Sequence, residues 1–188
     1  TITGKLAEIN TAIASASYTG VKDNAVIVTD VITAAQQKTL DGANNGQITA
    51  TISDNYLDKL ADIADANTKS HKLTITVKGD DSTKPTERTV GAKALKALEA
   101  LTSTLLTVDA DTLTAGASNG DDIRDITALV NKNTPSSGSP TITGLSNIAV
   151  TIGGTKTYSH NTLAAINNII EKAGVVTATM VDKATADG

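Results

Sequence analysis

The chain has 188 residues, a formal net charge of −4 and 19% charged residues. Its lysines and arginines are scattered and its only aromatic residues are three tyrosines, a composition that argues against nucleic-acid binding. No run of about 18 apolar residues occurs, so we expect no membrane span. With no Phe, Trp or Cys and a single Met, the core must consist of Ile, Leu, Val and Ala.

Short segments in which apolar residues alternate with threonine predict β-strands that have one polar face. They lie at residues 25–29, 48–52, 73–77, 106–110, 148–152 and 176–180. After an N-terminal helical segment, Leu, Ile and Ala at helical spacing predict helices over 34–43, 55–66, 91–103, 120–132 and 162–173. The polar stretches 79–89 and 133–140, which contain prolines, are predicted loops.

Helices and strands alternate in a pattern that returns three times. We divide the chain into repeat units at 1–54, 55–114 and 115–182, each of the form αβαβ, followed by a tail at 183–188. Thr-Ile-Thr-Gly occurs at 1–4 and again at 141–144, and residues 47–54 match 175–182 in register. The chain begins without Met, which is expected of a processed chain or of a fragment.

Helices that separate successive strands favour parallel pairing through crossovers. The threonines on alternate positions indicate that one sheet face packs on helices while the other is polar. We therefore predict an α/β repeat protein, a two-layer solenoid-like stack with mostly parallel Thr-rich strands and helices on one face. The alternative is an α+β sandwich whose threonine face meets a partner.

The segment at 20–54 resembles a repeat of large secreted cyanobacterial surface proteins of the haemolysin-type or β-strand-repeat class. The likeness rests on Thr-Ile-Thr-Gly at 1–4, on residues 20–54 and on a degenerate copy at 141–182. The resemblance implies an extracellular, S-layer-like, filamentous or adhesive role, and it transfers no catalytic residues. The glycine-rich calcium-binding nonapeptide of haemolysin-type toxins is absent from this sequence.

Acidic residues suggest one metal hypothesis. Asp109 and Asp111 end a predicted strand, and Asp121 and Asp122 open a predicted helix, so these four could supply the oxygen ligands that calcium prefers. The simpler interpretation of the second pair is that acidic side chains in a first helical turn interact favourably with the helix dipole. Apart from calcium at these positions, we expect no cofactor.

No nucleophile motif, phosphate-binding loop or zinc motif is present, and we expect the protein not to be an enzyme. The two histidines, His71 and His160, have no neighbouring histidine or cysteine, and we interpret them as solvated or capping residues. Threonine pairs such as Thr49 and Thr51 could order water, as in ice-binding proteins, but threonine also simply suits a half-exposed strand.

The strand predicted near the C-terminus carries the main functional prediction. Val176, Thr177, Ala178, Thr179 and Met180 form a bare strand without the features of a capping repeat, so we expect them to mediate homotypic assembly. The predicted function is a non-enzymatic extracellular structural protein that self-assembles into a surface layer or filament. The alternatives are a calcium-dependent adhesin or glycan-binding module, and a virion fibre or decoration protein.

Overall fold

The computed structural model describes residues 1–66, 70–115, 121–133, 135, 138–146, 148–152 and 176–178. Its helices are α1 (Leu6–Ala14), α2 (Ala34–Ala43), α3 (Leu57–Leu60), α4 (Ala92–Glu99) and α5 (Asp121–Asn133), with a 3-10 turn η1 (Val21–Asp23). Its strands are β1 (Ile2–Gly4), β2 (Val26–Ile32), β3 (Ile48–Ile52), β4 (Lys72–Val77), β5 (Thr89–Gly91), β6 (Leu106–Val108), β7 (Thr112–Ala115), β8 (Ile142–Thr143), β9 (Ala149–Ile152) and β10 (Val176–Ala178).

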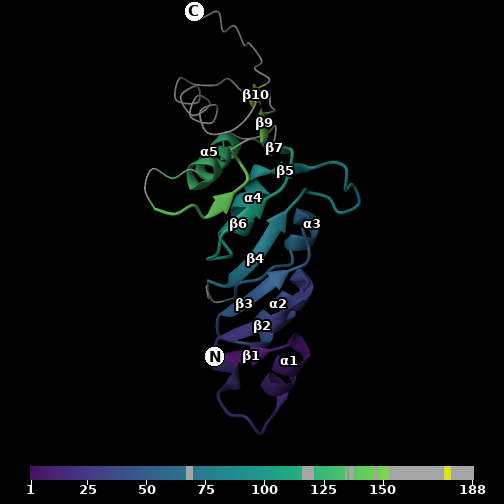
Figure 1. Ribbon diagram of the computed structural model, residues 1–188, viewed down its shortest axis with the longest axis vertical. Coiled ribbons are helices and arrows are strands. Elements are labelled where there is room, and N and C mark those ends of the chain that lie inside the picture. Colours follow the sequence, from purple (N-terminus) through teal and green to yellow (C-terminus); the bar gives the residue numbers. More distant parts are fainter. Residues whose placement is uncertain are drawn as a thin grey trace, which may run out of the picture.

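The strands form two sheets, and every described strand pair is parallel. The larger sheet has the order β1-β2-β3-β4-β6-β8, and the smaller has the order β10-β9-β7-β5. In the larger sheet the spatial order of the strands therefore follows the chain, and the strands succeed one another along the long axis of the molecule (Figure 1). The predicted α/β class with mostly parallel strands is confirmed.

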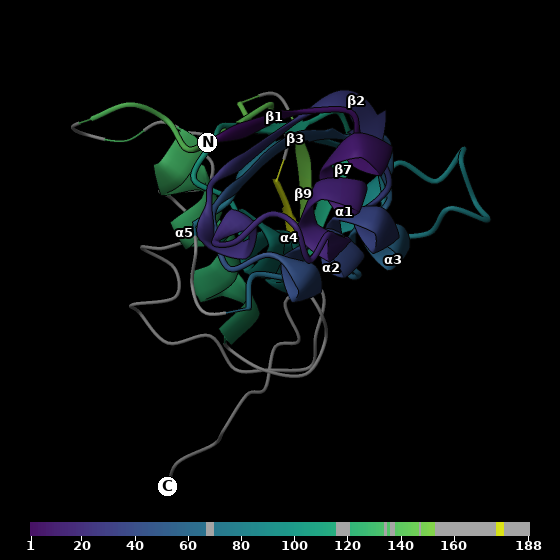
Figure 2. The same cartoon turned by 90° about the horizontal axis from the view of Figure 1, so that it is seen from below.

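Alternate positions of the larger sheet face opposite environments, as the threonine pattern predicts. Val26 of β2 pairs with Ile48 of β3, and both side chains are fully buried. Thr51 of β3 pairs with Thr74 of β4, and both are exposed. The helices α1 and α2 lie to one side of β1, β2 and β3 (Figure 2). The core of this sheet thus lies on the helical side, and the other face carries threonines together with the exposed Ile27 and Val31 of β2.

The smaller sheet was not predicted. The sequence pattern gave no strand at 89–91 or 112–115, where β5 and β7 lie. The predicted strand at 148–152 corresponds to β9, which belongs to the smaller sheet, while β8 extends the larger one. The missed strands have two to four residues, which is too short for an alternation of apolar and polar residues to be recognised. They are defined by their pairing with neighbouring strands that are distant in the sequence.

The prediction of one helix over residues 55–66 was wrong in length, because α3 ends at Leu60. Ala61, Asp62 and Ile63 still bond to their own preceding turn, whereas the N–H groups of Ala64 and Ala66 bond to side chains of α2, as described below. The predictions of α2, α4 and α5 are confirmed to within a few residues at each end. The helix predicted at 162–173 lies outside the described residues.

Two helices are capped by aspartates from the next strand along the sheet. The carboxylate of Asp30 accepts a 2.9 Å hydrogen bond from the backbone N–H of Leu6, the first residue of α1. Asp54, just after β3, accepts a 2.7 Å bond from the N–H of Ala34, the first residue of α2. Asp30 lies where the register of β2 shifts, and such irregularities re-aim side chains. Each of these hydrogen bonds therefore links the start of a helix to the strand that follows that helix in the chain, or to the residues just after it.

We expect Asp54→Ala to lower the free energy of unfolding by about 1 kcal/mol, because the first N–H of α2 loses its acceptor. Asp54→Asn is the matched control, since its amide oxygen still accepts the hydrogen bond and the loss should be smaller. Urea denaturation followed by circular dichroism measures both. Equal stabilities for Asp54→Ala and the unaltered protein would contradict the capping role.

Candidate functional site

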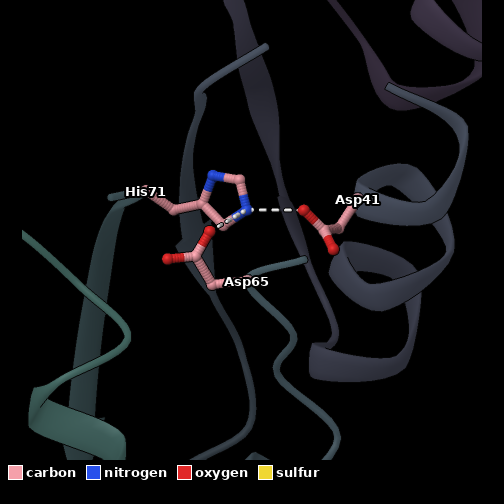
Figure 3. A group of neighbouring side chains, drawn as sticks. All are labelled: Asp41, Asp65 and His71. Atoms are coloured by element: carbon pink, nitrogen blue, oxygen red, sulfur yellow. Dashed lines mark hydrogen bonds and ion pairs between the residues drawn. The ribbon is translucent and has the colours of Figure 1, made fainter. Parts of the chain in front are cut away.

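Three titratable side chains from separate segments meet inside the molecule (Figure 3). Asp41 lies on α2, Asp65 lies after α3, and His71 immediately precedes β4. The His71 Nε2 atom is 2.8 Å from Asp41 Oδ1 and 3.6 Å from Asp65 Oδ1. The side chain of His71 is 0% exposed and that of Asp41 is 1% exposed, so this cluster has no contact with bulk water at its centre.

The cluster is built around the buried polar face of α2. Gln37 and Asp41 lie one helical turn apart and are both buried. The amide of Gln37 donates to the carbonyl of Ala64 (2.9 Å) and accepts from the N–H of the same residue (3.0 Å). Asp41 Oδ2 accepts from the N–H of Ala66 at 2.9 Å. Because α2 satisfies the backbone groups of Ala64 and Ala66, the chain after Ile63 has no need to continue as a helix.

His71 occupies a position that belongs to the apolar core of the sheet. Thr49 pairs with Lys72, so the preceding residues Ile48 and His71 lie opposite each other. The alternation along β4 places His71 on the same side as Leu73, Ile75 and Val77, all of which are buried. The prediction that His71 is solvated is therefore wrong. The same two-residue period, extended back by one step from Leu73, was the signal that could have placed it inside.

The hydrogen bonds of His71 define its tautomer. The backbone N–H of Ile48 donates to His71 Nδ1 at 3.0 Å, so Nδ1 carries no proton. Nε2 carries the ring proton and donates it to Asp41. A neutral imidazole thus connects a backbone donor on β3 with a carboxylate on α2. In this sense His71 caps a backbone group, as the sequence suggested.

The three side chains of this cluster also have the spacing of metal ligands. One atom from each of the three side chains lies within 4.8 Å of the other two, which is close enough for a small cation. A metal bound at a histidine nitrogen normally leaves the other ring nitrogen protonated and donating to an acceptor. Here that nitrogen faces the N–H of Ile48, which is a donor. The donor set therefore fits a structural network better than a resident metal.

The structure places the two predicted calcium pairs in different surroundings. Asp109 and Asp111 flank Arg88: its Nη2 is ion-paired with Asp109, and its Nε lies 3.5 Å from Asp111 Oδ1. The guanidinium of Arg88 thus already forms ion pairs with both carboxylates. Asp121 and Asp122 are the first residues of α5, a position where the helix dipole favours negative charge. Asp109 and Asp111 do not belong to a group with metal-ligand geometry among the described side chains, and the side chains of Asp121 and Asp122 lie outside that description.

The predicted assembly strand is partly described. Val176, Thr177 and Ala178 form β10, which pairs in parallel with β9 at one end of the smaller sheet. Thr179 and Met180 lie outside the described residues, as does His160. No helix in the described part of the chain combines the length and apolarity that a membrane crossing requires.

An open depression of about 720 Å³ lies beside α3 and α4. Its lining is mostly small and apolar, with the carboxylates of Asp58 and Asp80 at its margin. Asp80 accepts from the N–H of Gly91 at the start of α4 (2.9 Å), and Asp58 accepts from the hydroxyl (2.6 Å) and the N–H (3.1 Å) of Ser82. Both carboxylates therefore hold the turn that leads into β5.

The pKa of Asp58 lies below its usual value, chiefly because the Ser82 hydroxyl donates to the ionised form. The pKa of the neighbouring Asp81 is lowered in the same way, chiefly by the hydroxyl of Thr83. Since both pKa values are depressed by folding, these contributions to stability are present above the unfolded-state pKa values and are lost as pH falls through the folded-state values.

We expect Ser82→Ala to raise the pKa of Asp58 toward its usual value, because the largest stabilising donor is removed. Thr83→Ala is the matched control: it should raise the pKa of Asp81 and leave that of Asp58 almost unchanged. Carboxyl carbon chemical shifts followed by NMR over an acid titration report both groups. An unchanged Asp58 titration in Ser82→Ala would contradict this assignment.

We expect His71→Leu to destabilise the fold by about 3 kcal/mol, because the N–H of Ile48 loses its acceptor and the Asp41 carboxylate loses its donor inside the core. The double variant Asp41→Leu/His71→Leu should lose less than the sum of the two single variants, since neither change then leaves the other partner buried and unmatched. Chemical denaturation of all four proteins measures this coupling. Additive losses would show that the two side chains do not act together.

The chain was compared with known proteins at the levels of family, sequence and structure. No protein-family model matches it, and neither a curated protein nor a solved structure matches it. The features of this chain from which a function can be argued are therefore an enclosed structural cluster, carboxylates that bind turns, and strand edges at the ends of the sheets.

Proposed function

We propose that the protein is a non-enzymatic extracellular structural protein whose copies assemble head to tail into a filament or surface layer. The observation that carries this proposal is that each end strand of the larger sheet has a partner on only one edge among the described residues. Within the described residues β1 pairs with β2 alone and β8 pairs with β6 alone. Figure 2 looks along the stack from the end at which β1 lies. An unpaired strand edge is a template for another strand.

The direction of the strands makes the two ends compatible. Because all strands run parallel, the first strand of one copy can follow the last strand of another without any change of direction. Contacts of this kind join different surfaces of two copies, and they produce open filaments or lattices when the rotation does not close. The order of strands along the chain also supports the finer proposal that the fold is a solenoid of stacked units.

The terminal strand β1 lacks the features that usually prevent pairing at an edge. It consists of Ile2, Thr3 and Gly4, with neither a charged residue nor a proline. Ile2 is only partly buried although it packs against the core. A second copy at this end would complete the burial of that side chain. The end of the sheet thus has both unused backbone groups and apolar surface.

A catalytic role has less support. The one described cluster of carboxylates with histidine is enclosed, with His71 0% exposed, so a substrate cannot reach its ring. Its hydrogen bonds are used in holding α2 to the start of β4. The extracellular location is supported by the resemblance of residues 20–54 to secreted surface repeats. The calcium-dependent adhesin is less favoured because Arg88 pairs with both Asp109 and Asp111.

Thr3 offers a direct test of assembly at this edge. The N–H of Ile2 donates to Ala25 of the adjoining layer, so the N–H of the next residue points toward the open edge. Thr3→Pro removes that outward donor while leaving the bond of Ile2 to the sheet in place, and proline is tolerated at such positions. We expect this variant to remain folded and monomeric where the unaltered protein forms oligomers.

Thr3→Val is the matched control, because it keeps the backbone N–H and the β-branched shape, and it should assemble. Size-exclusion chromatography with light scattering measures mass over a range of protein concentrations, and electron microscopy shows the form of the assemblies. A protein that stays monomeric at every concentration would refute the proposed function. Assembly of Thr3→Pro at the level of Thr3→Val would show that this edge is not used.

A further inference from the structure

The two outermost strands of the larger sheet have the same sequence. β1 lies within Thr1-Ile2-Thr3-Gly4, and β8 lies within Thr141-Ile142-Thr143-Gly144. These are the strands at opposite ends of the order β1-β2-β3-β4-β6-β8. The repeated tetrapeptide therefore marks the first and the last position of one continuous parallel sheet.

The two copies of the tetrapeptide also face the same way. Ile2 pairs with Val26, which is fully buried, and Ile142 pairs with Leu106, which is fully buried. Both isoleucines thus belong to the inward column of the sheet. Thr3 is exposed and Thr143 is half-buried, and Thr143 pairs with Thr107 on the outward face. If a strand with the sequence of β1 lay beside β8, its isoleucine would extend the inward-facing side chains of the sheet, and its threonine would extend the outward-facing ones.

From this match we infer that β8 of one copy pairs in parallel and in register with β1 of a second copy, with Ile2 opposite Ile142 and Thr3 opposite Thr143. This inference rests on the proposed head-to-tail assembly and names the strands that form the junction. It extends the inward column with a buried isoleucine and the outward row with a threonine. The occupant of the β8 edge is therefore a second copy of this chain.

The smaller sheet is a poorer candidate for the junction. β10 lies at one end of that sheet, and the opposite end is β5, which comes from the middle of the chain. The end of the molecule at which β1 lies thus offers no strand of the smaller sheet for β10 to meet. Of the two sheets that the described strands form, only the larger has a strand at both ends of the stack. The junction is accordingly assigned to β8 rather than to residues 176–180.

Disulfide trapping tests the register, and the absence of native cysteine makes it specific. Neighbouring strands lie about 4.8 Å apart, within the roughly 4.4–6.8 Å that a disulfide allows between Cα atoms. Thr3→Cys mixed with Thr143→Cys should give disulfide-linked dimers under mild oxidation, and the doubly substituted chain should give a ladder of multimers on a non-reducing gel.

Thr107→Cys is the matched control, because Thr107 lies on the same face one strand further from the edge. Its Cα would be about 10 Å from that of Thr3 in the neighbouring copy, which is beyond disulfide reach. We expect at least a tenfold lower yield of the 3–107 dimer than of the 3–143 dimer. Equal yields of the two would overturn the register, since they would reflect random collision.

The two proposals fail in different ways. Oligomers seen by light scattering without a 3–143 crosslink would overturn the β8–β1 junction and leave head-to-tail assembly standing. Monomers at all concentrations would overturn both. Hydrogen exchange of the unaltered protein needs no variant: the Thr3 amide should become protected as concentration rises, and the Thr3 amide exchanging equally fast in monomer and oligomer would overturn the junction.

Discussion

Parallel pairing is the constraint on which the rest of this structure depends. Parallel neighbours cannot be joined by a tight turn, so the chain must cross over between each strand and the next. In the larger sheet these crossovers contain the helices, which leaves the opposite face to rows of exposed threonine such as Thr51 and Thr74. Because the strands follow chain order, the sheet begins at β1 and ends at β8. The two edges that no described strand pairs are thus a direct result of how the strands are connected.

Polar groups inside the stack hold layers together where apolar packing cannot specify one arrangement. Gln37 and Asp41 on α2 bind backbone groups of Ala64 and Ala66, and His71 connects α2 with β3. Buried polar groups stabilise a fold only when their hydrogen bonds are made, so the position of each is closely determined. This requirement explains why an imidazole lies on the buried side of the sheet beside Ile48 and Leu73. Buried titratable groups can thus hold separate segments of a fold together.

Sequence patterns predicted the parts of the fold in which neighbouring residues decide the outcome. The threonine alternation of β3 and β4 and the helical spacing of apolar residues in α4 are local signals, and all three elements are confirmed. The short strands β5 and β7 and the early end of α3 depend on partners distant in sequence, which local propensity does not report. The buried cluster was missed for the same reason, since Asp41, Asp65 and His71 come from three segments. The pairing of Asp109 and Asp111 with Arg88 likewise required the fold to be known.

The aspartate caps impose an order on folding during synthesis. α1 obtains its cap from Asp30 and α2 from Asp54, so each helix leaves the ribosome before the residue that completes its first turn. Chains emerge at about 5–20 residues per second, which is slow compared with helix formation. Until the following strand has been made, α1 and α2 have only their local caps, in which Glu8 accepts from the N–H of Lys5 and Thr33 accepts from the N–H of Gln36. The cap of each of these helices is therefore completed only when the next layer has been made.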